Sequence, residues 1–377
     1  MSRRVVIVDA VRSPLGRRDG ALASVHPVDL AATVVKGLLG RAGVAPRVDE
    51  VMLGSASPVG EQGLNVARHV ALAAGLPHEV GGLTIDAQCG AGLRAVLAAV
   101  DAVAAGTHDV VVAGGVEHMT RVPFGTALLL GGDPLGPRLL ERYPAPVPQG
   151  VAAERAAAAA GLGREALDGW AARSHRRAAD VRARAGATDE MVAVAGITAD
   201  EPPVAGPVDA EALAAFPPEW DADGVVTAGN RAGAADGAAA VLVVAAEVAA
   251  AHGFPVLAEV SGTATAGGDP YEFGAAALPA TRSALARAGL DLAAVDRFEV
   301  GEQFAVATLA WVQACGADPE RVNVRGGAIG LGHPLGATGA RMVVTLLHEL
   351  AASGSRYGLA TLAGADGVGA ALVVTRG

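Results

Sequence analysis

Short runs of β-branched and small apolar residues, each bounded by glycine or polar residues, recur along the chain. They are VVIVDAV (5–11), VVVAGGVE (110–117), AAAVLVV (238–244) and GAALVV (369–374). Runs of this length without polar alternation are typical of strands that are buried on both faces. Alanine-rich segments of helical length, such as 27–43 and 278–289, lie between them. This alternation predicts an α/β fold of layered helices and sheets.

The stretch 121–222 breaks the alternation. It is rich in proline, glycine, alanine and arginine, with turn clusters at 143–150 and 201–207. We interpret it as a partly helical loop domain that leaves the core. It separates an N-terminal unit, residues 1–120 completed by about 223–250, from a C-terminal unit, residues 251–377.

The two units resemble each other. Segments 41–54 and 287–301 share Arg-Ala-Gly, a spacer, Val-Asp and a strand that ends in glycine, and segments 89–115 and 335–364 share a glycine-rich turn, a helix and a strand. Alanine-rich segments can look alike by chance. Two matches in the same order nevertheless favour a duplicated α/β unit.

Composition and charge exclude several classes of protein. With 51% hydrophobic and 18% charged residues, the chain can bury a large core. Its net charge of −10 argues against a general nucleic-acid binder, which needs a basic surface. The apolar run before Asp9 is too short for a signal peptide, and no stretch of about 18 apolar residues suggests a membrane span. We therefore expect a soluble, cytoplasmic protein without membrane contact.

One of the two cysteines, Cys89, lies in DAQCGAGLRAV (86–96), where a glycine-rich turn leads into a predicted helix. A helix N-terminus stabilises a thiolate, so the sequence predicts a lowered pKa for Cys89. The alternative is a buried cysteine that acts as a small hydrophobic residue. A nucleophilic cysteine needs a base, and His333, in the glycine-rich segment GGAIGLGHPLGATGAR (326–341), is the candidate. No metal-ligand spacing, P-loop or dinucleotide fingerprint occurs, so we expect neither a metal nor a bound cofactor.

Six segments together resemble the thiolases, that is, the acetyl-CoA acetyltransferases and 3-ketoacyl-CoA thiolases. They are QCGAGLRAV, AGGVEHMT (113–120), VTAGNRAGAADGAAA (226–240), GEQFA (301–305), GGAIGLGHPLGATGAR and TLAGADGVG (361–369). The resemblance extends over nearly the whole chain. It implies a five-layer α-β-α-β-α sandwich of two similar halves, with an inserted loop domain that covers coenzyme A (CoA).

The resemblance also implies roles for individual residues. Cys89 would take an acyl group from a CoA thioester, with His333 as its base, and the backbone N–H groups of Cys89 and Ala365 would form an oxyanion site. The CoA arm would contact the positions of Gln149, Ala228, Ala232 and Phe304. The implied partner is therefore an acyl-CoA substrate, with no permanently bound cofactor.

The phosphates of CoA need local positive charge in an acidic protein. The segment RSHRRAADVRARAG (173–186) supplies it, and we expect Arg176 and Arg177, together with Arg182, to contact these phosphates. The alternative is a solvated helix face.

This sequence departs from the family pattern at two positions of the second half-reaction. The cysteine that moves the α-proton of the acceptor is replaced by Ala363, and the asparagine that anchors a water in the oxyanion site is replaced by Gly301. Ala232 replaces a serine, and Pro148-Gln149 replaces a His-Met pair, in the CoA-binding region. Loss of an acid or base costs roughly 10²–10⁴ in rate. Candidate substitutes are Asp366, whose alternative is a solvated turn carboxylate, and Glu302, which we expect to be structural.

Two hypotheses about function follow. The first is an acyltransferase that works through acyl-Cys89, by an atypical or decarboxylative condensation or by acyl transfer without condensation. The second is an acyl-CoA-binding partner subunit or a slow thioesterase, without C–C bond chemistry. From the resemblance we also expect a homodimer or homotetramer, with a hetero-complex as the alternative.

Overall fold

The computed structural model describes residues 3–42, 48–129, 131–183, 189–204 and 208–377. The strands of its N-terminal half follow the order β4-β3-β5-β6-β1, and those of its C-terminal half follow β7-β10-β9-β8. Among the described residues, the two sets of strands pair with each other through β1 and β7, where Val6 pairs with Glu259 and Ile7 with Ala258. The strands are β1 (Val5–Arg12), β2 (Gly16–Arg17), β3 (Glu50–Gly54), β4 (Gly81–Ile85), β5 (Val110–His118), β6 (Ala235–Ala245), β7 (Ala258–Gly267), β8 (Arg297–Val300), β9 (Tyr357–Ala363) and β10 (Val368–Thr375).

The two halves repeat one motif. In the first, β3 pairs in parallel with β5, and the helix α3 (Ala91–Ala105) precedes β5. In the second, β8 pairs in parallel with β9, and the helix α13 (Leu335–Ser353) precedes β9. Parallel strands need such a helical crossover, because a tight turn cannot join them. The duplication expected from the sequence is confirmed.

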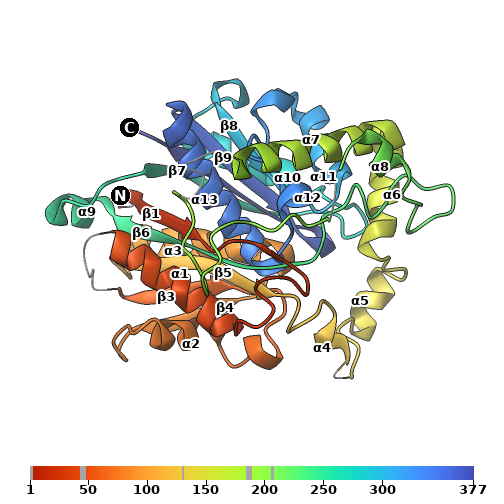
Figure 1. Ribbon diagram of the computed structural model, residues 1–377. Helices are drawn as coiled ribbons and strands as arrows, with labels where there is room; N and C mark the ends of the chain where they lie inside the picture. Colours follow the sequence, from red (N-terminus) through yellow and green to blue (C-terminus); the bar gives the residue numbers. More distant parts are fainter. Residues whose placement is uncertain (1–2, 43–47, 130, 184–188, 205–207) are drawn as a thin grey trace.

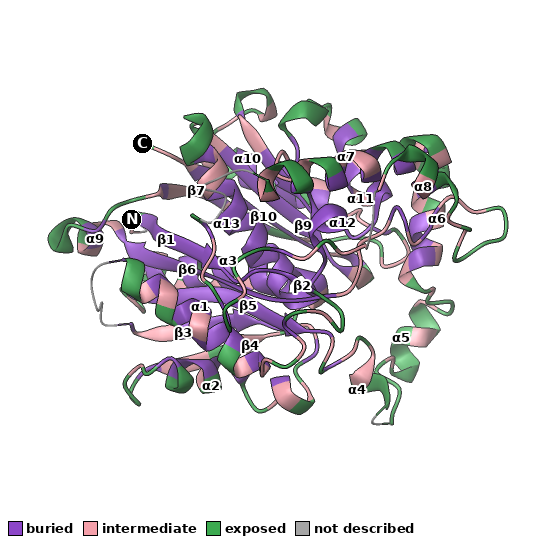
Figure 2. Cartoon of the chain, in the orientation of Figure 1, coloured by how far each residue is buried: buried purple, intermediate pink, exposed green. Residues whose placement is uncertain are grey.

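The helices and strands form five layers (Figure 1). The helices α3 and α13 pack against each other between the two sets of strands. The outer face of the N-terminal half is covered by α1 (Pro27–Arg41) and α2 (Val66–Ala73), and that of the C-terminal half by α10 (Ala277–Ala288), which contacts α11 (Ala305–Cys315). Three buried apolar clusters fill the spaces between these layers, and exposed residues are concentrated on the outer helices and loops (Figure 2).

The predicted elements are found where the apolar runs placed them. The four predicted strands are β1, β5, β6 and β10, and the two predicted helices are α1 and α10. Each of the four strands has a buried middle, which explains why none alternates with polar residues.

The described part of residues 121–222 forms helices and loops and contains no strand. The helices are α4 (Thr126–Leu129), α5 (Pro137–Arg142), α6 (Gln149–Ala160), α7 (Arg164–Arg182) and α8 (Ala210–Ala214). They lie along one side of the layers (Figure 1). The remaining helices are α9 (Ala246–His252), α12 (Ala328–Leu331) and the 3₁₀ helices η1 (Gly60–Gln62), η2 (Gln88–Gly90), η3 (Leu292–Ala294), η4 (Pro319–Arg321) and η5 (Ala365–Gly367).

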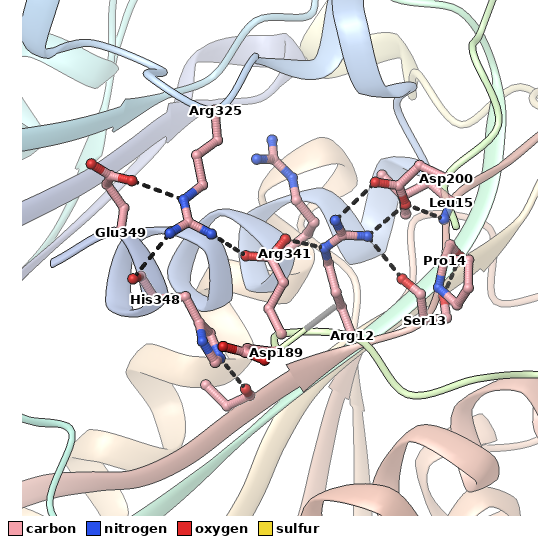
Figure 3. Close-up of polar contacts among 12 residues, drawn as sticks. Arg12, Ser13, Pro14, Leu15, Asp189, Asp200, Arg325, Arg341, His348 and Glu349 are labelled. Carbon is pink, nitrogen blue, oxygen red and sulfur yellow. Dashed lines mark hydrogen bonds and ion pairs between the residues drawn. The ribbon is translucent and has the colours of Figure 1, made fainter. Parts of the chain in front are cut away.

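A buried ion network joins Glu190 and Asp200, both within the segment 121–222, to the two halves of the fold (Figure 3). At the end of β1, the Arg12 guanidinium donates to both carboxylate oxygens of Asp200, at 2.6 and 2.9 Å, and to Glu190 at 2.7 Å. Arg325 pairs with Glu190 at 3.5 Å and with Glu349 of α13 at 2.8 Å. Burial raises the pKa of Asp200, but the charge and hydrogen bonds of Arg12 outweigh it, and the net direction is downward. Asp200 therefore stays ionised and fixes the segment in place.

One helical segment among the described residues, Gln88–Ala105, is long and apolar enough to cross a membrane. It contains α3 and lies between the two sets of strands, in the central core cluster. A core helix passes the same test of length and composition, so this segment carries no argument for a membrane.

Candidate active site

Cys89 and His333 lie next to each other, just before the N-termini of the two central helices α3 and α13. Cys89 lies on η2, immediately before α3, and is 4% exposed. His333 lies between α12 and α13, and its backbone N–H donates to the carbonyl oxygen of Gly233 at 2.9 Å. The His333 Nε2 is 3.3 Å from the Cys89 Sγ. The pairing predicted between residues 244 positions apart is present in the structure.

Glycines allow the close approach of α3 and α13. A Cβ on Gly92 would lie 2.5 Å from the carbonyl oxygen of Gly336, and a Cβ on Gly339 would lie 2.5 Å from the backbone nitrogen of Leu93. Both distances are far below van der Waals contact, so side chains here would force the helices apart. Glycine at these crossings therefore sets the spacing between the cysteine and the histidine.

A hydrogen bond on the far side of the ring fixes the tautomer of His333. The Thr338 Oγ1 donates to the carbonyl oxygen of Pro334 at 3.1 Å and lies 2.7 Å from the His333 Nδ1. Because the hydroxyl proton is used on Pro334, Nδ1 carries a proton and donates to Thr338. The Nε2 that faces Cys89 is then free to accept the thiol proton.

The cysteine and the histidine are neutral at rest. Burial, followed by the negative charge of Glu117, raises the pKa of Cys89 to about 12. Burial, followed by the positive charge of Arg341, lowers the pKa of His333 to about 3. The lowered cysteine pKa expected from its place at a helix start is therefore wrong, because loss of hydration outweighs the helix N-terminus. The proton must pass from sulfur to nitrogen during the reaction.

The buried Glu117 carboxylate holds the backbone next to the Cys89–His333 pair in place. Its carboxylate accepts hydrogen bonds from the backbone N–H of Ala56 at 2.7 Å, from that of Gly336 at 2.8 Å and from the Gln62 side chain at 2.7 Å. Burial raises the pKa of Glu117, although these donors oppose the shift. The carboxylate holds the first turn of α13, and with it the residues that follow His333.

Gln303 fills the space beside the two altered positions, Gly301 and Ala363. Its Nε2 donates to the carbonyl oxygen of Ala363 at 2.6 Å. Its Oε1 lies 3.0 Å from the place that a Cβ on Gly301 would occupy. Burial raises the pKa of Cys89, and the Gln303 side chain opposes that shift. Gln303 was not predicted from the sequence, where its one signal is a glutamine in the altered GEQFA segment.

Comparisons with known proteins agree with this arrangement. Residues 5–247 match the family model of the thiolase N-terminal domain, and residues 254–376 match that of the thiolase C-terminal domain. The chain belongs to the thiolase family.

Relatives of the thiolase chain cover its whole length. It is 41% identical to an acetyl-CoA acetyltransferase of Pseudomonas aeruginosa, over 99% of each chain. It is 36% identical to a 3-ketoacyl-CoA thiolase of Bacillus subtilis, over 98% of each chain. The crystal structure of the Bacillus anthracis acetyl-CoA acetyltransferase superposes with a TM-score of 0.89 at 37% identity, covering 100% of this chain and 99% of that one. The five-layer thiolase fold predicted from the sequence is confirmed.

The two candidate substitutes for the missing thiolase groups have different surroundings. The Glu302 carboxylate is buried and accepts from the Trp170 Nε1 and the Ser174 hydroxyl, both at 2.6 Å, and from the backbone N–H of Ile329 at 2.9 Å. These contacts tie α7 to α12, the short helix before His333, so Glu302 has a structural role. Asp366 is exposed and has a φ of 54°, and it accepts a 2.6 Å hydrogen bond from the Gln88 side chain. Asp366 therefore contacts Gln88, the residue that precedes Cys89 in the chain.

Two of the residues expected around the CoA arm, Ala232 and Phe304, adjoin Gln303. Ala228 and Ala232 are half-buried, and the backbone N–H of Ala232 donates to the carbonyl oxygen of Gln303 at 2.9 Å. The Phe304 ring lies edge-on to Phe273, with the ring centroids 5.0 Å apart. Gln149 begins α6, and Ala365 begins η5. Contact of these residues with CoA stays a prediction.

The three arginines expected at the phosphates differ in their contacts. Arg176 is exposed on α7. Arg177 pairs with Glu320 at 2.8 Å and donates to the carbonyl oxygen of Val322 at 2.7 Å, and Arg182 donates to that of Gly330 at 3.4 Å. Arg177 and Arg182 thus hold α7 against the C-terminal half, and their contact with CoA stays a prediction. The end of this basic segment, 184–186, lies outside the described residues.

Proposed function

We propose that this thiolase is an acyltransferase that takes an acyl group from a CoA thioester onto Cys89 and passes it to an acceptor. The observation that carries the proposal is the 3.3 Å approach of the His333 Nε2 to the Cys89 Sγ, with the tautomer that leaves Nε2 free. A nucleophile and a base within hydrogen-bond reach, the base oriented by a third group, form the arrangement of a covalent catalyst. The relatives named acetyl-CoA acetyltransferase and 3-ketoacyl-CoA thiolase indicate the donor class, a CoA thioester.

The acylation step uses groups that the chain retains. His333 takes the thiol proton while the Cys89 sulfur bonds to the thioester carbonyl carbon, and the oxygen gains negative charge. The backbone N–H groups of Cys89 and Ala365 are proposed to stabilise that oxygen. The bond to the CoA sulfur then breaks, and CoA leaves with the proton from His333. The step needs neither a metal nor a redox cofactor.

The second step is proposed to differ from that of an ordinary thiolase. Ala363 presents a methyl group where the family has a proton-transferring cysteine, and Gly301 presents no side chain to anchor a water. Acyl transfer to an acceptor without C–C bond formation, or a condensation that obtains its carbanion by loss of CO₂, removes the need for that cysteine. An acyl-CoA-binding partner subunit, or a slow thioesterase, is the alternative.

Mass spectrometry of Cys89 tests the proposal directly. After incubation with several acyl-CoAs, we expect the peptide that contains Cys89 to gain the mass of the acyl group. Cys89→Ala should abolish the adduct, and His333→Ala should slow its formation about 10²–10⁴-fold, because a general base is lost. Cys315→Ala is the matched control, since it removes the other free cysteine and leaves the site intact. Absence of an adduct with every acyl-CoA would favour the partner-subunit alternative.

A further inference from the structure

The two turns that carry the proposed oxyanion donors pack against each other. Cys89 lies on η2, and Ala365 begins η5. A Cβ on Gly364 would lie 3.5 Å from the carbonyl oxygen of Ala87 and 3.5 Å from the side-chain oxygen of Gln88, which is ordinary van der Waals contact. The way in which these turns are held together therefore sets the distance between the two donors.

The backbone N–H groups of Cys89 and Ala365 are available to a ligand. Among the described residues, neither N–H is paired with a carbonyl oxygen, whereas the neighbouring N–H of Gly364 donates to that of Val368 at 2.7 Å. Cys89 is buried and Ala365 is half-buried. Backbone N–H groups away from water need an acceptor, so this pair suits an oxygen that gains negative charge.

A side-chain hydrogen bond joins the two turns. The Gln88 Nε2 donates to the Asp366 Oδ2 at 2.6 Å, between residues 278 positions apart. Gln88 directly precedes Cys89, and Asp366 directly follows Ala365. The bond therefore links the neighbours of the two donors. An amide N–H bonded to a carboxylate is a charge-assisted hydrogen bond, which is one of the stronger kinds.

The backbone at both ends of this hydrogen bond is left-handed. The φ of Gln88 is 52°, and that of Asp366 is 54°. Residues other than glycine adopt this conformation at a cost in free energy, and they keep it only where their surroundings hold them. The N–H of Gln88 also donates to the Asp86 carboxylate at 2.9 Å. The conformation of Gln88 is thus fixed by its side chain and by its N–H, and the peptide group that follows it contains the Cys89 N–H.

We propose that Gln88 and Asp366 are positioning residues, whose hydrogen bond fixes the distance between the N–H groups of Cys89 and Ala365 and so shapes the oxyanion site for acyl transfer. The proposal deepens the acyl-Cys89 function above and rests on it. It gives Asp366 a role in which the carboxylate accepts a hydrogen bond and moves no proton.

Two variants break this hydrogen bond from opposite sides. Gln88→Met keeps the length of the side chain and removes the donor. Asp366→Gly removes the acceptor and leaves a residue that adopts a positive φ freely. Asp366→Asn is the conservative variant, since its side-chain oxygen can still accept from Gln88 but the group no longer transfers a proton. Asp19→Gly is the matched control, because Asp19 is another exposed aspartate with a positive φ, 60°.

Two reactions of Cys89 separate this role from a general disturbance of the site. Acylation by acetyl-CoA or by p-nitrophenyl acetate places negative charge on a carbonyl oxygen, so it uses the two N–H groups. Alkylation by iodoacetamide attacks a saturated carbon and does not use them. Mass spectrometry of the Cys89 peptide follows both reactions at pH 8, and thermal unfolding checks that each variant folds.

We expect Gln88→Met and Asp366→Gly to slow acylation about ten- to a hundredfold, because the N–H groups remain but are misplaced. Alkylation should stay within about twofold of the wild-type rate, since no oxyanion forms. Asp366→Asn and the control should be acylated as fast as wild type. The double variant Gln88→Met/Asp366→Gly should be no slower than the slower single variant, because both changes remove the same hydrogen bond.

Three outcomes would overturn the inference. They are equal slowing of acylation and alkylation, wild-type acylation in both variants that lack the hydrogen bond, and an Asp366→Asn variant as slow as Asp366→Gly, which would assign Asp366 a charge or proton-transfer role. The ester keeps this test separate from that of the proposed function. Acylation by the ester but by no acyl-CoA, slowed in both variants, would support the positioning role and count against the proposed donor. A Cys89 that neither reagent acylates would overturn both.

Discussion

At the scale of single residues, the site is defined by a neutral thiol and a neutral imidazole rather than by an ion pair. The raised pKa of Cys89, about 12, and the lowered pKa of His333, about 3, bracket the physiological range. Below pH 12 the thiol keeps its proton, and above pH 3 the imidazole can accept it. The reactive protonation state is therefore present throughout pH 5.5–9.

This state predicts a flat pH profile for acylation. Between pH 5.5 and 9 we expect the rate of Cys89 acylation by a saturating acyl-CoA to show no inflection near 6.5, the ordinary histidine pKa. Stopped reactions analysed by mass spectrometry would measure it. An acidic limb with a midpoint between pH 6 and 7 would show that His333 titrates there, which contradicts a buried neutral ring.

The two reacting residues could be predicted from the sequence, whereas the residues that set their positions and pKa values could not. Cys89 and His333 stand in segments specific enough to be assigned from a family resemblance. Thr338, Glu117 and Gln303 act through distances and burial that arise only when distant segments meet. The sign of the cysteine pKa shift was missed for the same reason, because a helix start is visible in a sequence and the extent of burial is not.

At the scale of elements, the contact between α3 and α13 places the nucleophile against its base. We predict that Gly92→Ala, whose new Cβ would meet the Gly336 carbonyl oxygen at 2.5 Å, separates the two helices. Overpacking of this kind costs about 1–3 kcal/mol of stability. Acylation of Cys89 should slow by more than about tenfold, because small misplacements at a reacting centre are costly. Urea unfolding and labelling kinetics measure the two effects.

Gly169→Ala is the control for this change. Gly169 is an exposed glycine within α7, and a Cβ there would meet no atom within 4 Å. Alanine should therefore leave acylation unchanged and stabilise the helix by up to about 1 kcal/mol. If Gly92→Ala behaved like Gly169→Ala, the close crossing would not be what positions Cys89.

The elements themselves were largely predictable, because buried strands and alanine-rich helices leave clear apolar runs. The order of the strands in the sheets was harder to predict from the sequence. The antiparallel pairing of β6 with both β1 and β5 joins the chain on either side of residues 121–222, and no local pattern encodes it. The length of α7 was also missed, since its sequence of arginines and alanines has no strong apolar stripe.

At the scale of the whole molecule, β4 lies at the end of the strand order of the N-terminal half. Leu83 within it is 42% exposed, and the neighbouring Leu64 is 89% exposed. An apolar edge strand favours pairing with another strand. We predict a homodimer that joins through β4, and Leu83→Lys should weaken it. Light scattering at micromolar concentration measures the mass, with Val256→Lys, at another exposed site, as the control. A wild-type monomer of 37.2 kDa would contradict the prediction.

We predict that this thiolase transfers acyl groups through Cys89 without efficient condensation of two acetyl groups. One assay tests this directly. The purified protein is incubated with acetyl-CoA and isotope-labelled CoA, and both the exchange of the label into acetyl-CoA and the formation of acetoacetyl-CoA are measured. A thiolase that has both cysteines is the reference enzyme. We expect exchange that depends on Cys89, with acetoacetyl-CoA formed at least about a hundredfold more slowly than by the reference enzyme. Condensation at the reference rate would contradict this separation of the two activities and would show that another group, with Asp366 the first candidate, moves the α-proton.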